Sequence, residues 1–514
     1  MRITNRMMTN GMLSNINGNK ERITTLEDQY ATGLKIQKPS DDPIVAVRAL
    51  KLRTNLAELN QYYEKNIPDA MAWMDVTEGA LKNVNSVLST MNTCCVQGAQ
   101  DTLTVSDRNA IAQNLTQMRN QIYQEGNANY AGRYVFTGYK TESSLVFDEN
   151  TEDYDYVMTE KLDFSNIGTV NKLVNPANIE MYDPDSPESS DFSQRPNMIE
   201  VYRIRLAYDN LVDGDNIGIS LNPQYDDFGN VVRDDDGNIV YEDVFTDINV
   251  VSSSDPEAFT PAEGTVNFIP ETGEIIIARD ICDEWTKEEK EIHITYEKNS
   301  FLKNDLKPEH YFDCVRTTYN SERELDEDTV INFTKEDQKI TYEVNFNQKL
   351  QINTQGSDSI SHDIGRMTDE ILEAIDSIVL VENRIAQVDK MLEDRNVTDA
   401  QKEALTTLKD MLSTEKILRE EILKDTFAAG ITETKKQQEV VGVAVSDLGS
   451  RYVRLELTES RLSTQQDDFT DLLSKNEDAD LVDTIINFTA AKTVYDSSLS
   501  AAAKVVQNSL LDFL

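Results

Sequence analysis

The sequence predicts an α+β fold in which both chain ends form one long coiled α-helical bundle, with a β-rich domain and a helical hairpin inserted between them. Two observations predict the bundle: apolar residues recur at spacings of three and four near the N-terminus, and they do so again near the C-terminus. A third observation, the strand-like alternation within residues 145–355, predicts the inserted domain. A narrow apolar seam cannot be buried within one helix, so each terminal helix requires a partner.

The two terminal seams are predicted to contact each other and neighbouring copies of the chain. The N-terminal seam lies in a segment rich in asparagine, a weak helix former, so this end is expected to become ordered on assembly. The residues of the predicted assembly interface are Ile16, Ile23, Leu26, Tyr30, Leu481, Ile485, Phe488, Tyr495, Leu499, Val506, Leu510 and Phe513.

Each predicted seam ends at a joint, where one helix stops and the next begins. Pro39 stops the first helix, because the helical conformation is disfavoured for the residue before a proline. Asp42 is expected to cap the next helix, with Pro43 as its first residue. The residues of this joint loop are Pro39, Ser40, Asp41, Asp42 and Pro43, and a second joint is expected at residues 474–480.

Longer helices are predicted inside the two joints. Residues 52–91 keep the helical spacing, and Pro68 is expected to kink this run or to mark a local irregularity. Towards the C-terminus, two further apolar runs predict an antiparallel helical hairpin near residues 367–425, which Gly430 is expected to end. The strongest heptad pattern of the chain, at residues 441–473, then predicts a separate long helix.

Three domains follow from this order of helices, strands and helices. Residues 1–38 with 475–514 form the predicted terminal coiled-helix domain. Residues 39–144 with 356–474 form the predicted helical bundle, which includes the hairpin. Residues 145–355 form the inserted β-rich outer domain, as one module or two.

The charge of the chain excludes two classes of binding partner. The chain carries 49 Lys and Arg against 92 Asp and Glu, a net charge of −43. Nucleic-acid binding depends on basic residues that release counterions, and anionic membranes attract basic segments, so neither is an expected partner. Membrane insertion is not expected, because no stretch approaches about 18 consecutive apolar residues. No apolar segment follows Arg2 and Arg6, so a cleaved signal peptide is not expected either.

Few residues fit a catalytic, cofactor or metal site. Three histidines without a His-Glu-x-x-His or Gly-x-Ser-x-Gly pattern argue against an enzyme, and no Walker or dinucleotide-binding pattern indicates a cofactor. The acidic run 234–238 lacks the first and last ligands of a calcium loop. Cys282, His293, His310 and Cys314 lack the close cysteine pair of structural zinc sites, so no metal is predicted. Cys282 and Cys314 can pair or remain buried thiols, and thiols are the simpler interpretation.

Several motifs occur in the order found in one family. The stretch 30–43, with Pro-Ser-Asp-Asp-Pro at its end, resembles the conserved loop of the flagellin-like family of bacterial flagellar proteins, in the form found at the hook–filament junction. Further similar motifs lie at residues 61–62, 107–112, 129–138, 459–462, 474–480 and 509–514. The resemblance covers roughly residues 1–140 and 440–514.

The resemblance implies a structural subunit of the bacterial flagellum that reaches the cell exterior through the flagellar type III export apparatus. Subunits of this kind assemble as a ring that adapts the first hook-associated protein to flagellin. The implied partners are therefore other copies of the chain, the first hook-associated protein, flagellin and a flagellar export chaperone. The paired terminal helices would line the central channel, and the inserted domain would face outward.

A flagellin filament subunit is the closest alternative, because flagellins share the paired terminal helices. The loop at 39–43 and the chain end at 511–514 favour the junction protein over the flagellin. A less favoured alternative is a surface-exposed protein whose 145–355 domain binds or hydrolyses glycans.

Overall fold

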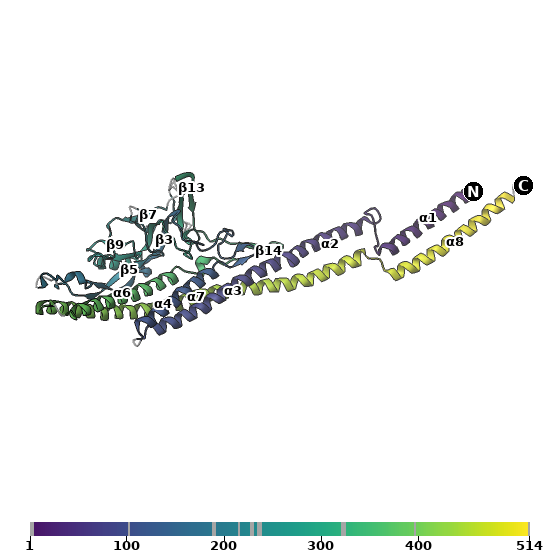
Figure 1. Cartoon of the computed structure of the whole chain (residues 1–514). Coiled ribbons are helices and arrows are strands. Elements are labelled where there is room, and N and C mark those ends of the chain that lie inside the picture. The colour runs from purple at the N-terminus through teal and green to yellow at the C-terminus, as the bar shows by residue number, and fades with distance from the viewer. Residues whose placement is uncertain are drawn as a thin grey trace. The chain divides into compact units, whose positions relative to one another are not determined.

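The computed structural model describes residues 5–100, 103–187, 192–213, 216–226, 231–233, 239–319, 325–394 and 397–511. The predicted α+β class is confirmed, because long helices come from both chain ends and a β-rich region with several sheets lies between them in the sequence (Figure 1).

The chain divides into two compact units. The terminal unit comprises Met1–Ala70, Tyr342–Leu350 and Val453–Leu514, and the central unit comprises Met71–Thr341 and Gln351–Tyr452. The division falls inside two long helices and two short strands rather than at linkers. The three-domain organisation therefore stays a prediction.

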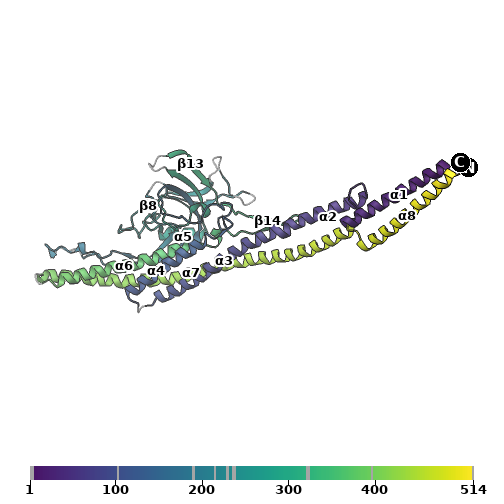
Figure 2. The same ribbon diagram turned by 45° about the vertical axis from the view of Figure 1, so that its right-hand side comes forward.

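The terminal unit consists of helices from both chain ends and one small hairpin. Its elements are α1 (Asn5–Thr32), α2 (Pro43–Gln61), the start of α3 (Ile67–Gly98), the end of α7 (Asp399–Glu477), α8 (Leu481–Leu511), and the strands β14 (Thr341–Asn345) and β15 (Gln348–Gln351). Figures 1 and 2 both show α1 beside α8, and α2 beside the end of α7. The second pairing includes a hydrogen bond of 3.0 Å from Gln466 Nε2 to Asn60 Oδ1.

The irregularity predicted at Pro68 is a single π-helical turn, Tyr62–Asn66, between α2 and α3. Proline has no N–H to donate to the carbonyl four residues earlier, so a regular α-helical ladder would be interrupted there. The wider turn absorbs this interruption just before the proline, and the two helices continue on either side of it.

Helices form one side of the central unit. They are α3, α4 (Val105–Glu125), α6 (Asp363–Leu392) and the first part of α7. Fully buried apolar side chains from all four helices include Trp73, Leu88, Met91, Leu115, Ile122, Ile371, Ile375 and Leu448. Polar contacts tie the helices together in pairs: Arg119 Nη1 lies 2.6 Å from Asp369 Oδ1, and Asn92 Nδ2 donates to Thr434 Oγ1 at 2.7 Å.

The expectation that Gly430 ends the helical hairpin is wrong. The hairpin itself is present, formed by α6 and the start of α7, but α7 continues without a break through Gly430 to Glu477. A Cβ atom at position 430 would lie 3.2 Å from Cys95 Sγ and 3.4 Å from Ile371 Cδ1. The glycine therefore permits a close approach of three helices and does not act as a stop signal.

Replacing Gly430 by valine is expected to destabilise the central unit by about 2 kcal/mol, because the added atoms overpack a closed helix contact against Cys95 and Ile371. The matched control is Gly442→Val in the same helix, where a Cβ atom would meet nothing within 4 Å. This control should be neutral or slightly stabilising, because valine has a higher helix propensity than glycine. Chemical denaturation of both variants measures the difference, and equal midpoints would contradict the packing argument.

Two mainly antiparallel sheets and a short helix form most of the rest of the central unit. In the described residues, one sheet has the order β4 (Gly168–Val174), β5 (Asn197–Arg205), β10 (Glu274–Ile277), β9 (Val266–Ile269) and β8 (Ile248–Val250). The other has the order β13 (Leu325–Phe333), β12 (Asp313–Tyr319), β3 (Tyr154–Asp163), β11 (Glu291–Lys298), β6 (Gly218–Pro223) and β7 (Tyr241–Phe245). Within the described residues of these two sheets, β8 and β9 pair in parallel and the other neighbouring strands pair antiparallel. The small pair β1 (Asn129–Tyr130) and β2 (Arg133–Tyr134) follows α4.

The two larger sheets share one hydrophobic core. Buried side chains of both sheets and of the helix α5 (Arg279–Lys287) belong to it, among them Met158, Ile204, Ile219, Phe268, Ile275, Trp285 and Ile294. A common core makes the two sheets pack as one body, as two layers of secondary structure do in a single domain.

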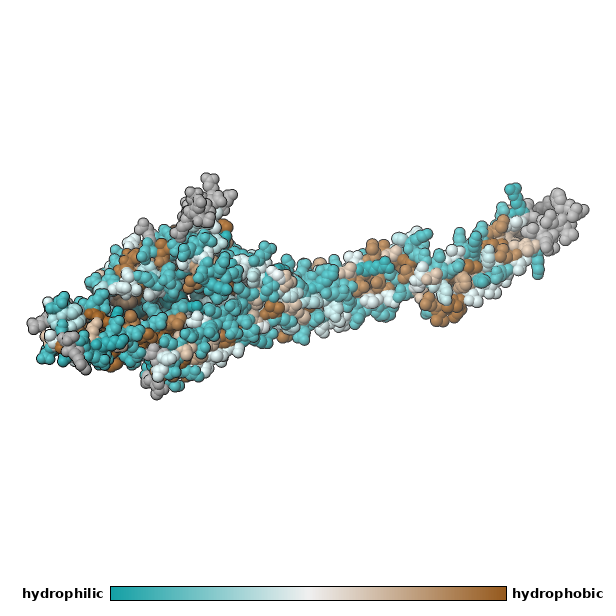
Figure 3. Space-filling view, viewed as in Figure 1, coloured by the Kyte–Doolittle hydropathy of each residue, from teal (hydrophilic) through white to brown (hydrophobic). Residues whose placement is uncertain are grey.

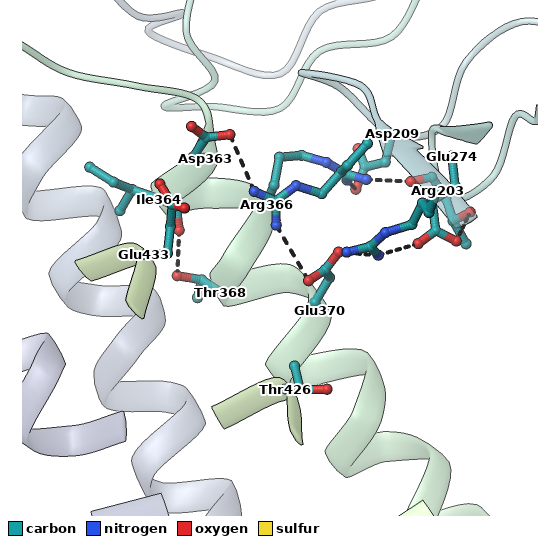
Figure 4. A network of polar contacts seen from close by, with 12 residues as sticks. Arg203, Asp209, Glu274, Asp363, Ile364, Arg366, Thr368, Glu370, Thr426 and Glu433 are labelled. Atoms are coloured by element: carbon teal, nitrogen blue, oxygen red, sulfur yellow. Dashed lines mark hydrogen bonds and ion pairs between the residues drawn. The ribbon is translucent and has the colours of Figure 1, made fainter. Parts of the chain in front are cut away.

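A network of ion pairs joins the five-stranded sheet to α6. Arg203 of β5 lies between Glu274 of β10 and Glu370 of α6, and its Nη1 is 2.6 Å from Glu370 Oε1 (Figure 4). Lys172 Nζ is 2.8 Å from Glu274 Oε2. Burial alone would raise the pKa of Glu274, but Lys172 and Arg203 hold it well below its usual value. The charges are therefore paired where the sheet meets the helix.

A second contact joins the connection between β4 and β5 to the hairpin of α6 and α7. Ala177 is fully buried among apolar residues of both helices, including Val381, Val388, Leu405, Leu408 and Leu412. Its N–H donates to Glu415 Oε2 at 2.7 Å, and its carbonyl accepts from Arg384 Nη1 at 2.9 Å. The hairpin predicted near residues 367–425 is thus bound to the inserted β-rich region.

Glu160 of β3 is expected to make the stability of the central unit depend on pH. Burial raises the pKa of its carboxyl group to about 7, although Ala207 N–H and Tyr296 OH both donate to Oε2 at 3.0 Å. The folded-state pKa lies above the value of 4.5 for a free glutamate. The stabilisation from the neutral form is therefore complete below about pH 4.5 and is lost as pH rises through about 7.

Glu160→Gln keeps an acceptor oxygen but cannot ionise, so at pH 8 this variant should be more stable than the unchanged chain, by on the order of 1–3 kcal/mol. At pH 5 the two proteins should be nearly equal. Denaturation curves at both pH values measure the difference, and a difference that does not change with pH would contradict the assignment.

Candidate assembly interface of the terminal helices

The two terminal helices pack along a seam with heptad spacing. The half-buried positions of α1 are Thr9, Met12, Ile16, Asn19, Ile23, Leu26 and Gln29, and the partly or fully buried described positions of α8 are Thr484, Phe488, Ala491, Tyr495, Ser498 and Ala502. Within each helix these positions recur at spacings of three and four, the pattern that lets two helices interlock. Asn19 Nδ2 donates to Ser498 Oγ at 3.3 Å across the seam. Polar and small residues thus share this seam with the apolar ones.

The residues of the predicted assembly interface divide into three groups. Ile16, Ile23, Leu26, Phe488 and Tyr495 lie in the seam between α1 and α8. Tyr30, Leu481, Ile485 and Leu499 are exposed on the outside of the same pair of helices. Val506 and Leu510 belong to α8, and Phe513 lies outside the described residues.

Further apolar residues are exposed on both sides of the joint, and the sequence interpretation missed them. On α8 they are Val482, Ile486 and Val494, and on α2 they are Ile44, Val47 and Leu50, with Ile44 exposed to 74%. Figure 3 shows hydrophobic patches over α2 and over the start of α8. The signal in the sequence was the adjacent pairs Leu481-Val482 and Ile485-Ile486, because neighbouring residues of a helix cannot both face one seam.

The predicted joint loop is held by two aspartates. Asp41 Oδ2 accepts from the N–H groups of Lys38 (2.9 Å) and Gln37 (3.1 Å), and these hydrogen bonds lower the pKa of Asp41. Asp42 Oδ1 accepts from the N–H groups of Ile44 and Val45, and Pro43 is the first residue of α2. Asp42 therefore caps α2 in the way that the sequence predicted.

The second joint connects α7 to α8 through residues 478–480 and follows the same principle. Asp480 Oδ1 accepts from the N–H groups of Val482 (2.9 Å) and Asp483 (3.2 Å), so an aspartate caps α8 as well. α2 and α8 thus each begin at a capped joint, and these caps fix where each of the two helices starts.

The two joints are hydrogen-bonded to each other. Lys35 N–H donates to the carbonyl of Glu477 at 2.7 Å, and Ala479 N–H donates to the carbonyl of Gly33 at 2.7 Å. These bonds flank the antiparallel bridge between Leu34 and Asp478. Gly33 has a φ of +71°, a conformation that favours glycine, at the residue where the chain leaves α1. The N-terminal and C-terminal arms therefore turn at the same place.

Side chains add to this contact between the joints. Arg53 Nη2 of α2 lies 2.7 Å from Glu477 Oε2, and Asn476 Nδ2 donates to the carbonyl of Val45 at 3.1 Å. The Arg53 side chain is mostly exposed, so its ion pair contributes little stability by itself, about 0–1 kcal/mol. The backbone hydrogen bonds and the aspartate caps therefore fix the geometry of the joint more than this ion pair does.

The residues considered for a metal site have other partners. His293 hydrogen-bonds to Tyr241 OH and to Glu291 Oε1, each at 3.0 Å, and His310 Nε2 lies 3.2 Å from the carbonyl oxygen of Ser144. Cys282 and Cys314 are both buried free thiols. Within the described residues no group of three His, Cys, Asp or Glu side chains could hold a metal, and the acidic run 234–238 lies outside them.

A search of the helices for membrane spans covers the same described part of the chain. None of these helices combines the length and the apolar character that crossing a membrane requires.

Comparisons with known proteins match both chain ends. The family model for the bacterial flagellin N-terminal helical region matches residues 3–141, and the model for the C-terminal helical region matches residues 431–514. Flagellar hook-associated protein 3 of Salmonella typhimurium is 33% identical over 155 residues, which are 30% of this chain and 48% of that protein. A flagellin of Clostridium tyrobutyricum is 32% identical over 122 residues, 24% of this chain and 32% of that flagellin.

The matched segments span less than half of the length of either relative. Among solved structures, a flagellar junction protein of Legionella pneumophila is 10% identical, with 85% of this chain and 100% of that chain covered. Its TM-score with this chain is 0.26. The relatives are structural flagellar proteins and not enzymes. Both terminal regions of this chain therefore match the helical regions of bacterial flagellins, and the relatives that it resembles there are flagellar structural proteins.

Proposed function

We propose that the chain is a structural subunit of the hook–filament junction, which assembles as a ring and adapts the first hook-associated protein to flagellin. The observation that carries the proposal is the apolar surface left outside the paired terminal helices. Val482 and Ile486 are exposed to 68% and 60%, although α8 already has α1 as its partner. Monomeric soluble proteins rarely expose contiguous apolar patches of this kind, so neighbouring subunits would cover them.

The physical reason is the free energy of burial. Each exposed valine, leucine or isoleucine side chain gains about 1.5–3 kcal/mol when it is fully buried. Several such residues lie on α2 and α8 around the joint. The joint holds these helices by caps and backbone hydrogen bonds, so their apolar faces are presented in a fixed arrangement, which lowers the entropic cost of association.

The proposed partners are those that the similarity to flagellar hook-associated protein 3 and to flagellin suggests. In the flagellum, the neighbours would be other copies of the chain, the first hook-associated protein on one side and flagellin on the other. Before assembly the same apolar faces would favour aggregation, so a flagellar export chaperone that covers the terminal helices fits this chain. The proposed location is the flagellum, outside the cell.

A flagellin filament subunit remains the second candidate, because a flagellin is among the relatives with 32% identity. The two functions differ in what the purified chain forms. A flagellin extends seeded filaments without limit, whereas a junction subunit adds only a short cap or ring. Electron microscopy of the purified chain mixed with filament seeds distinguishes them, and long filaments made of this chain alone would overturn the junction assignment.

Removing either terminal helix is expected to abolish incorporation into the flagellum. Deletion of residues 1–30 or of residues 480–514 takes away one partner of the seam between α1 and α8, and also part of the outward apolar surface. The buried core of the central unit contains none of these residues, so circular dichroism should still show a cooperative unfolding transition. Motility of cells that carry only a truncated chain measures incorporation, and normal swimming would contradict the proposal.

A further inference from the structure

A large cavity lies in the central unit, away from the terminal helices. Its walls come from β4, from the loop 253–259, from α6 and from α7. Its volume is about 670 Å³. Pockets that hold small molecules have volumes of about 300–1,000 Å³, so this one has the size of a ligand site.

The cavity is lined by equal numbers of cationic and acidic side chains. Its cationic side chains are Lys172, Arg203, Arg384 and Arg419, and its acidic side chains are Asp255, Glu370, Glu373 and Asp425. The cations already have partners in the structure: Lys172 pairs with Glu274, Arg203 with Glu274 and Glu370, Arg419 with Glu415, and Arg384 donates to the carbonyl of Ala177. An anionic ligand would have to displace a carboxylate or carbonyl from one of these contacts, which is costly for partly buried ions. Among sugars, the cavity therefore favours neutral ones over anionic ones.

Neutral hydrogen-bonding groups and apolar surface make up the rest of the lining. Amide and hydroxyl side chains are contributed by Thr169, Asn171, Asn178, Gln194, Ser377 and Thr426. The hydroxyls of Ser377 and Thr426 already donate to carbonyls of their own helices, but their oxygens can still accept a hydrogen bond from a sugar hydroxyl. Phe259 and Ile422 supply apolar surface against which the C–H face of a sugar ring can pack.

We propose that this cavity binds a neutral oligosaccharide. The inference goes beyond the junction function, because the cavity contains no residue of the terminal helices. The site takes one wall from the inserted β-rich region and the opposite wall from α6 and α7. A fragment of residues 145–355 alone would lack the helical wall, so the full chain is required for binding.

An extended peptide is the competing ligand, because β4 is the edge strand of its sheet. Asn171 Nδ2 in the middle of β4 donates to Asp425 Oδ2 of α7 at 2.9 Å. This bond ties the edge strand to the helix, and a peptide strand added along β4 would have to break it. A short oligosaccharide can bind on one side of this bond, so the sugar is favoured.

The test is binding of the fluorescently labelled full chain to an array of neutral and sialylated oligosaccharides that also carries neutral, serine-rich decapeptides. Saturable binding to neutral glycans is expected. Ser377→Trp, which fills the cavity from α6, should weaken this binding at least about tenfold, equivalent to about 1.4 kcal/mol. The matched control is Ser446→Trp, because Ser446 of α7 is exposed, does not line the cavity and, like Ser377, donates to a carbonyl of its own helix.

A second variant, Thr426→Trp, fills the same cavity from α7 and should give the same loss. Thermal unfolding of all three variants identifies any that fail to fold. Binding of decapeptides but not glycans would overturn the proposal, and so would the absence of binding to any neutral glycan. Equal glycan binding by folded Ser377→Trp or Thr426→Trp would show that the sugar binds elsewhere, which also overturns it.

Discussion

Replacing Val482 and Ile486 of α8 together by aspartate is expected to abolish incorporation into the flagellum while leaving the monomer folded. Both side chains are largely exposed, so the substitution removes little buried surface within the monomer. At a subunit contact, each substitution loses about 1.5–3 kcal/mol of the free energy gained by burying the apolar side chain. Each new carboxylate must in addition be desolvated. The penalty is repeated at every copy in a ring. Motility of cells that carry only this variant should therefore be lost, and purified variant should show an unchanged thermal midpoint.

The matched control is Ile417→Asp in α7, because Ile417 is exposed to 64%, close to the 60% of Ile486, and is also helical. It lies in the central unit, outside the terminal helices. Cells with this variant should swim normally if assembly depends on the faces around the joint. Two outcomes contradict the argument: normal motility of the double variant, or an equal loss of motility with Ile417→Asp.

Features with a local signal in the sequence could be predicted well. The caps at Asp42 and the helix start at Pro43 depend on residues that are adjacent in the chain, and the structure has both. The helical period of the terminal segments is equally local, so α1 and α8 and the irregularity near Pro68 could be found from the sequence. The alternation of the middle region revealed strands, although it could not reveal which strands would pair.

Features that depend on remote partners could not be predicted. Glycine is a residue type that often ends helices, so the sequence alone suggests that Gly430 ends one. Only the close packing of Cys95 and Ile371 against Gly430 shows why a glycine lies in the middle of α7. The assembly surface is an intermediate case: the adjacent apolar pairs at 481–482 and 485–486 indicate a second apolar face of α8, but only the placed partner helix shows that Val482 and Ile486 are the exposed members. The ion pairs of Figure 4 and the cavity join segments far apart in the sequence, so no local pattern contains them.

Glu415→Ala is expected to release the connection between β4 and β5 from the helical hairpin. The Glu415 side chain is fully buried, and its two oxygens accept from Ala177 N–H and from Arg419 Nε, each at 2.7 Å. Alanine leaves a buried N–H without an acceptor and a largely buried guanidinium without its carboxylate, at a cost of about 3 kcal/mol. Hydrogen exchange of the Ala177 amide should accelerate by on the order of 100-fold, because local opening becomes easier. Mass spectrometry of peptides that cover residues 175–187 measures this exchange.

Two companion variants separate the causes of that effect. Glu415→Gln keeps an oxygen that accepts from Ala177 N–H but loses the charge opposite Arg419, so its exchange rate should lie between those of the unchanged chain and Glu415→Ala. Glu403→Ala removes an exposed glutamate of the same helix and should leave the exchange of Ala177 unchanged. If Glu415→Ala exchanged no faster than Glu403→Ala, the apolar cluster of Leu408 and Val381 alone would hold the connection. The buried carboxylate would then serve only to satisfy the groups around it, and the attachment of the β-rich region to the hairpin would be hydrophobic.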